Sequence, residues 1–167
     1  MNGPVSQELK GPNLDRALVA IVGIHGPMAM MIVAGLDHRF AWSSFIPGIG
    51  QYLAALAIVG GYGMAVWAMA VNRYFSAVAR IQRDRGQVVV TAGPYRIVRH
   101  PSYAGAFIAS LALPIMLDAI CAVVPALAIV VALIIRTKLE DRMLMEELEG
   151  YPAYAATTPH RLVPGIW

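Results

Sequence analysis

Four apolar stretches alternate with polar segments along the chain and predict membrane-spanning helices. Residues 17–36 and 52–71 are uncharged and predominantly apolar, and each is long enough to cross a bilayer at about 1.5 Å of rise per residue. Residues 104–135 contain one charge, Asp118, and are too long for one span. We expect two short helices there, roughly 104–117 and 119–135, forming a helical hairpin that turns near Asp118. The pattern predicts an all-α integral membrane protein of about four transmembrane helices.

Composition supports this class. Of the 167 residues, 58% are hydrophobic and 14% are charged, whereas a soluble domain carries about 25% charged residues. A chain of this length is expected to form a single domain, residues 1–167. The one cysteine, Cys121, lies in an apolar run, so we expect a buried thiol, no disulfide framework and no metal site.

Basic residues indicate the orientation of the spans. Arg39 falls between the first two apolar stretches, whereas the other twelve lysines and arginines, Lys10 included, lie on the opposite side if the chain crosses four times. The positive-inside rule makes that side cytoplasmic. We therefore expect both termini, and the polar segments 72–103 and 136–167, in the cytosol.

The first polar segment ends in GPYRIVRHPSYAG, residues 93–105. We interpret residues 72–85 as a short interfacial helix and QVVVT as an extended connector. Because the residue before a proline avoids the helical conformation, Pro101 is expected to begin a helix. His100, Ser102 and Tyr103 would then surround a helix N-terminus, whose free backbone N–H groups favour anionic ligand groups. A basic anchor for anionic lipids is the alternative interpretation.

The second polar segment begins at the end of the last apolar stretch. If that helix continues, Arg136, Glu140 and Glu147 share one face, and Asp141 is rotated by about 100° from Glu140. A solvated helix with ion pairs is one interpretation. Charges that begin at the end of a membrane span favour a partner or a ligand instead.

Small residues within the first two spans predict close helix packing. The sequences are GIHG at 23–26 and GGYG at 60–63, and small side chains let helix backbones approach each other in lipid. We expect His25, near the middle of the first span, to be satisfied by a neighbouring helix.

Several chemistries have no support in the sequence. It contains no HExxH motif, no cysteine and histidine cluster, and no GxGxxG loop after a strand. It also lacks the GxSxG motif of serine hydrolases. A cofactor would have to bind among helix ends and the two polar segments.

The two polar segments together resemble the isoprenylcysteine carboxyl methyltransferase family and the related phospholipid N-methyltransferases. The resemblance covers residues 73–167 and rests on an Arg-His-Pro-x-Tyr-x-Gly segment, an Arg-x-x-x-Glu-acid helix, and a Gly, Tyr and Arg-x-x-Pro ending. The matching residues are Arg99, His100, Pro101, Tyr103, Gly105, Arg136, Glu140, Asp141, Gly150, Tyr154, Arg161 and Pro164. Asp141 stands where the family has a second glutamate, and the spacing between Gly150 and the following tyrosine departs from the family pattern.

The resemblance implies an S-adenosylmethionine pocket at the cytosolic ends of the last two helices, closed by the C-terminal tail. It implies cofactor contacts from His100, Tyr103, Gly105, Glu140, Asp141, Tyr154 and Arg161. Arg136 is the candidate for orienting an acceptor carboxylate, with Glu140 as its partner. A thiol or amine acceptor would need a base, for which His100 or Glu140 could serve.

The expected partners are a lipophilic or lipid-like acceptor and membrane lipids, with no nucleic acid. Two other functions remain open at this point. One is a membrane reductase of sterol or enone type that uses NADPH, to which the C-terminal half is distantly similar. The other is a non-catalytic membrane scaffold or small transporter, which would leave the ordered polar motifs without a purpose.

Overall fold

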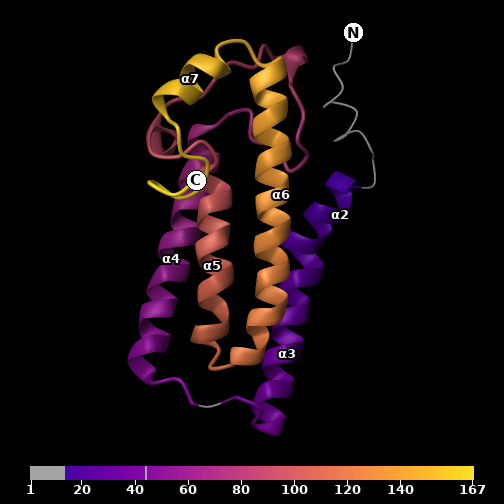
Figure 1. Ribbon diagram of the computed structural model, residues 1–167, viewed down its shortest axis with the longest axis vertical. Coiled ribbons are helices and arrows are strands. Elements are labelled where there is room, and N and C mark those ends of the chain that lie inside the picture. Colours follow the sequence, from indigo (N-terminus) through magenta and orange to yellow (C-terminus); the bar gives the residue numbers. More distant parts are fainter. Residues whose placement is uncertain (1–13, 44) are drawn as a thin grey trace.

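The computed structural model describes residues 14–43 and 45–167, which form an elongated helical bundle (Figure 1). The helices are α2 (Leu14–Ala20), the π-helical turn η1 (Ile21–His25), α3 (Gly26–Phe40), α4 (Gly48–Val71), α5 (Pro101–Met116), α6 (Val123–Glu147) and α7 (Tyr151–Thr157). The short 3₁₀ turns are η2 (Arg83–Arg85), η3 (Gly93–Arg96) and η4 (Ile120–Ala122).

Three helical stretches are long and apolar enough to cross a membrane, and α5 is a shorter apolar helix. The long stretches are Leu14–Phe40, Gly48–Val71 and Ile120–Glu147. The predicted all-helical, multi-pass membrane architecture is confirmed.

Helices far apart in the sequence pack in pairs. The most extensive helix contact joins α4 to α5, and α3 packs along α6. Between α3 and α6 lies a buried cluster of Met30, Ala126, Ile129 and Leu133, against which Tyr103 and Phe107 of α5 pack. Large apolar side chains of α4, such as Leu56 and Val66, remain exposed, as expected for a surface that faces lipid.

Two predicted features of the last hairpin have different outcomes. The turn near Asp118 is confirmed, because α5 ends at Met116 and Asp118 adopts a left-handed conformation with φ of 53°. The predicted short helix 119–135 is longer than expected, since α6 runs to Glu147. Residues 136–147 contain no glycine or proline, and strong helix formers follow one another until Gly150, where φ reaches 81°.

The predicted interfacial helix over residues 72–85 is wrong. Apart from the short turn η2, this segment is irregular. Side chains here bind the backbone and compete with helix formation. The buried Gln82 amide donates to the Tyr74 carbonyl at 2.5 Å, and the Tyr74 N–H donates to the Asn72 side chain at 2.9 Å. Residues 87–91, predicted as an extended connector, form neither helix nor strand.

Side-chain hydrogen bonds tie the two loops at the end of the bundle distant from α7. The buried Asp37 carboxylate accepts from the Ser43 N–H and hydroxyl, both at 2.8 Å, and from the Cys121 N–H at 3.0 Å. Asp118 accepts from the Ile46 N–H at 2.6 Å. These bonds join the α3–α4 loop to the α5–α6 turn.

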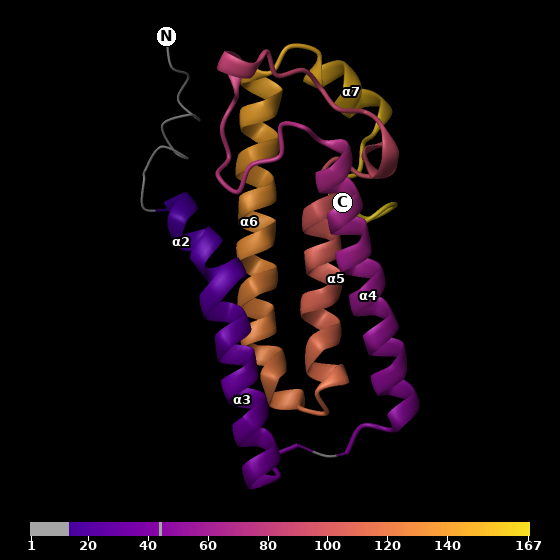
Figure 2. The ribbon, with the colours of Figure 1, turned by 180° about the vertical axis from the view of Figure 1, so that it is seen from behind.

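The polar segments gather at the opposite end. The segment after α4, the end of α6, α7 and the C-terminus lie together, away from the α3–α4 loop (Figures 1 and 2). Among the residues that the structure describes, Arg39 is the lysine or arginine of the other end, where His38 precedes it. Lys10, which the sequence analysis places with the larger basic group, lies outside the described residues.

Candidate functional site

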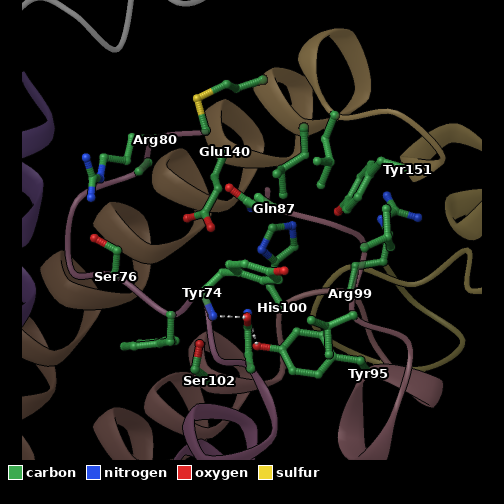
Figure 3. A pocket seen from close by; sticks show the side chains of 18 of the residues that line it. Tyr74, Ser76, Arg80, Gln87, Tyr95, Arg99, His100, Ser102, Glu140 and Tyr151 are labelled. Atoms are coloured by element: carbon green, nitrogen blue, oxygen red, sulfur yellow. Dashed lines mark hydrogen bonds between the residues drawn. The ribbon is translucent and has the colours of Figure 1, made fainter. Parts of the chain in front are cut away.

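A cavity lies at this polar end, between the segment after α4 and helices α5, α6 and α7. It has a volume of about 90 Å³ and is partly open to solvent. Figure 3 shows polar side chains of Glu140, His100, Gln87, Ser76 and Ser102 around it. Its apolar lining comes from Val78, Val88, Val89, Val90, Met143, Leu144 and Leu148.

The sequence RHP positions His100 at the start of α5. His100 has φ of −123° and ψ of 64°, outside the helical region, and Pro101 is the first helical residue, as predicted. The His100 ring is parallel to that of Tyr103, with centroids 5.8 Å apart. Both side chains line the cavity.

The C-terminal tail occupies part of the predicted anion-binding surface. The Arg99 N–H donates to the His160 carbonyl at 2.9 Å, and the His100 N–H donates to the Arg161 carbonyl at 3.0 Å. These two backbone groups are therefore engaged by the protein, and the tail is fixed against the start of α5.

Glu140 supplies a carboxylate to the cavity. The Tyr103 hydroxyl donates to its Oε2 at 2.5 Å, which holds the carboxylate in place over α5. A carboxylate beside apolar and aromatic walls can bind a cationic ligand group. Glu140 thus faces a space that a ligand can occupy.

Asp141, the next residue, is bound entirely within the protein. It accepts from Arg99 Nε at 2.8 Å, Arg99 Nη2 at 3.0 Å, Tyr151 Oη at 2.9 Å and Arg161 Nε at 2.8 Å, and His100 Nε2 lies 3.2 Å away. It is 2% exposed. Neither Asp141 nor Arg161 is among the residues that line the cavity; together they fasten the tail and α7 to α5 and α6.

Burial and charge shift the pKa values of groups around Asp141. Burial, and then the negative charge of Asp141, raises the pKa of Tyr151 well above its usual value. Although burial opposes the charge of Arg99, its hydrogen bond with Asp141 raises the pKa of that guanidinium. Tyr151 therefore stays a hydrogen-bond donor and Arg99 stays charged at neutral pH.

Tyr154 closes the cavity from α7. Its hydroxyl donates to the Tyr95 carbonyl at 2.7 Å, and its ring lies edge-on to Tyr151. Burial raises the pKa of Tyr154 to about 12. The residue lines the cavity, where the sequence analysis expected it.

Gly105 lies away from the cavity, in the contact between α4 and α5. A Cβ atom on Gly105 would meet the Gly61 carbonyl oxygen at 2.1 Å, and one on Gly61 would meet the Gly105 oxygen at 2.6 Å. The observed role of Gly105 is therefore helix packing. The predicted packing role of the glycine sequences holds for Gly61 and Gly26, whereas a Cβ added to Gly23, Gly60 or Gly63 would meet no atom within 4 Å.

Arg136 lies one aromatic ring away from the cavity. Its guanidinium carbon is 5.5 Å from the centre of the Tyr103 ring, and its Nη2 donates to the Ala77 carbonyl. It forms an ion pair with Asp15 of α2, with Nε and Oδ1 separated by 3.4 Å, rather than with the expected Glu140. Glu147, predicted on the same face, lies 3.7 Å from Arg83.

Sequence reasoning missed Gln87, Ser76 and Asp15. Gln87 and Ser76 line the cavity from the irregular segment after α4, where no motif or periodicity marks a site. Asp15 did carry a signal, since it is an acidic residue at the very start of an apolar stretch.

Comparison with known proteins bears on what this arrangement does. The model of the isoprenylcysteine carboxyl methyltransferase family matches residues 53–146, which is more than half of the chain. The chain belongs to this family. The match runs from α4 to the end of α6 and includes His100, Tyr103, Arg136 and Glu140; α2, α7 and the tail lie outside it.

A curated relative shares part of this sequence. Protein-S-isoprenylcysteine O-methyltransferase B of Arabidopsis thaliana is 29% identical over 103 residues, which cover 58% of this chain and 51% of the relative. The chain thus spans about half the length of the curated relative it matches.

Proposed function

We propose that this chain is an S-adenosylmethionine-dependent methyltransferase that methylates the carboxylate of a lipophilic acceptor at the membrane surface. One observation carries the proposal beyond family membership. A cavity lined by Glu140 and His100 opens where apolar helices α5 and α6 meet the polar segments. A charged cofactor can therefore reach the cavity from water, and a lipid-like acceptor can reach it from the bilayer.

The residues around the cavity fit the cofactor. The Glu140 carboxylate suits its ammonium group, and the exposed Arg80 can pair with its carboxylate. Val89, Leu144 and Leu148 offer apolar surface for its adenine. When bound, S-adenosylmethionine supplies an electrophilic methyl group on a sulfonium. His100 and Tyr103 orient the cofactor from the start of α5, and Tyr154 excludes water from the α7 side.

We place the acceptor carboxylate on Arg136, beside the Tyr103 ring. A carboxylate is already ionised at neutral pH and needs no base, so its orientation by a guanidinium is the main requirement. The family name and that of the Arabidopsis relative support a prenylated cysteine carboxylate. If the acceptor were a thiol or an amine, Glu140 or His100 would have to take a proton.

The site faces the cytosol in this proposal, with both termini on that side. The support is the distribution of charge. The end of the bundle that bears the cavity also bears Arg73, Arg80, Arg83, Arg85 and Arg96, which favours a cytoplasmic location.

Calorimetric titration of S-adenosylmethionine into detergent-purified protein tests the cofactor site. We expect binding that weakens by at least about tenfold in Glu140→Gln, because loss of a charged hydrogen-bond partner costs about 1.5–3 kcal/mol. Glu146→Gln is the matched control, since that side chain pairs with Arg142 on the exposed face of the same helix. Folded protein that binds NADPH and ignores S-adenosylmethionine would contradict the proposal and favour a reductase.

Transfer itself is followed with cofactor labelled in the methyl group and N-acetyl-S-farnesylcysteine as the acceptor. A methyl ester releases labelled methanol in base, whereas a methylated thiol or amine does not. Label that is stable in base would overturn the carboxylate assignment.

A further inference from the structure

A buried ion pair next to the cavity is poorly bonded. Asp15 of α2 and Arg136 of α6 are each 5% exposed. Their closest charged atoms are 3.4 Å apart. Within residues 14–43 and 45–167, neither Asp15 oxygen accepts a hydrogen bond, and Arg136 Nε donates none.

This arrangement contrasts with that of Asp141 on the same helix as Arg136. Charge-assisted bonds between guanidinium and carboxylate are usually about 2.7–2.9 Å long, and Arg99 and Arg161 reach Asp141 at 2.8 Å. A buried charge without such bonds is strongly destabilising. The Asp15 carboxylate therefore neutralises Arg136 without fitting it closely.

The Asp15–Arg136 pair lies next to residues that line the cavity. Arg136 stacks near the Tyr103 ring, and the Tyr103 hydroxyl binds Glu140. Tyr103 and Glu140 both line the cavity. Hence an anion on Arg136 is separated from the proposed cofactor space by one side chain.

The helix that bears Asp15 joins the bundle through an irregular turn. Below the turn, α3 is fixed against α6, since a Cβ on Gly26 would lie 2.3 Å from Ile129 Cγ1. The turn itself, η1, is π-helical and contains Gly23, which has no neighbour within 4 Å of an added Cβ. Single π-helical turns are frequent at functional sites. Figures 1 and 2 show α2 beyond this turn, at the free end of the first long helix.

We propose that the Asp15 carboxylate occupies the position beside Arg136 that the carboxylate of the acceptor takes when the acceptor binds. This inference rests on the proposed function and names what regulates its acceptor site. An entering carboxylate that reaches Arg136 at normal hydrogen-bond length displaces Asp15, and α2 moves about η1. An uncharged acceptor gains nothing from Arg136 and does not displace Asp15, so Asp15 is a specificity-determining residue that selects anionic acceptors.

The test measures binding of N-acetyl-S-farnesylcysteine and of its methyl ester to the full chain in nanodiscs without cofactor. Asp15→Asn removes the competing charge and keeps the shape of the side chain. Asp15→Ser provides a second variant, and Asp84→Asn, in an exposed turn of the basic end, controls for the change in net charge.

We expect both Asp15 variants to bind the acid at least about fivefold more tightly than the wild type, the lower end of coupling between linked sites. Affinity for the ester should change by less than about twofold, and Asp84→Asn should match the wild type. Acid affinity that is unchanged or weaker in folded Asp15 variants would overturn the proposal and make Asp15 a residue that positions Arg136. Absence of acid binding in every variant would overturn it as well.

Turnover with S-adenosylmethionine separates this inference from the proposed function. Tighter acid binding in Asp15→Asn without methyl transfer by any variant would retain the anion site and refute the methyltransferase assignment. Methyl transfer by the wild type, with no gain in acid affinity in the Asp15 variants, would retain the methyltransferase assignment and refute the proposed role of Asp15.

Discussion

Glu140 and Asp141 are adjacent carboxylates of α6 with opposite surroundings. One helical step of about 100° separates their directions. Asp141 accepts from Arg99, Arg161 and Tyr151 and is buried. Glu140 is held by Tyr103 and faces the cavity. Asp141 therefore holds the surrounding elements together, whereas Glu140 remains able to bind a ligand.

Asp141→Asn should destabilise the fold. The amide cannot balance the charges of Arg99 and Arg161, and breaking a buried ion network costs about 3–5 kcal/mol. Thermal unfolding in detergent, followed by circular dichroism, measures the loss. Glu149→Gln, at an exposed position, should stay within about 0.5 kcal/mol of the wild type. An Asn variant as stable as the wild type would show that the network is not structural.

Tyr154 should make the fold sensitive to alkali. Its pKa is raised by burial to about 12, above the value of about 10 for an unfolded chain. The stability it contributes is fully present below about pH 10 and is lost as pH rises through about 12. Between pH 8 and 12, the unfolding temperature should fall less steeply in Tyr154→Phe than in the wild type. The control is Tyr52→Phe, on the exposed face of α4, which should follow the wild-type curve. Equal slopes would contradict this assignment.

At the scale of elements, the contact between α4 and α5 positions the start of α5, which carries His100 and Tyr103. The helices touch through backbone atoms at Gly61 and Gly105, where no side chain fits between them. Any separation of these helices moves one wall of the cavity relative to α6.

Gly61→Ala and Gly105→Ala should therefore destabilise the protein by about 1–3 kcal/mol, the usual cost of overpacking. Gly60→Ala and Gly63→Ala are matched controls on α4, because an added Cβ meets no atom within 4 Å. These controls should be neutral or more stable by up to about 1 kcal/mol, since alanine favours helix. Unfolding temperatures of the four variants decide the matter, and equal effects at all four positions would refute the close contact.

The elements that sequence reasoning located are those defined by local chemistry. Apolar length predicts the existence of the spans, the HP dipeptide predicts where α5 begins, and Asp118 marks a turn. The predicted end of the last span was too early, although the helix formers up to Gly150 did favour a longer helix. The irregular course of residues 72–85 was missed because it depends on side-chain bonds to the backbone, such as that of Gln82 to the Tyr74 carbonyl.

The same division holds for the candidate site. The motif residues His100, Tyr103, Glu140 and Tyr154 line the cavity. Gln87 joins them from a segment without a motif, and the direction of Asp141 into a network depends on where the tail folds back. A motif thus identifies residue types, whereas the packed fold decides which of them a ligand can reach.

In the molecule as a whole, the cavity and most of the basic residues lie at the same end of the bundle. The cavity, α7 and the basic segment after α4 lie at one end, and the α3–α4 loop lies at the other (Figure 1). Because helices of a multi-pass protein are anchored across the bilayer, the two ends face different compartments. Under the positive-inside rule, the proposed orientation places the cavity end in the cytosol.

Single-cysteine labelling tests this orientation. In a Cys121→Ala background, which removes the protein's one native thiol, Asp84→Cys marks the basic end and Phe45→Cys, at a position 76% exposed, marks the α3–α4 loop. A membrane-impermeant maleimide should label Asp84→Cys in inside-out vesicles and not in intact cells, and should label Phe45→Cys with the opposite preference. The reversed result would place the cavity on the side of the membrane away from the cytosol. S-adenosylmethionine is not made on that side. Such a result would therefore count against the proposed activity as well as against the orientation.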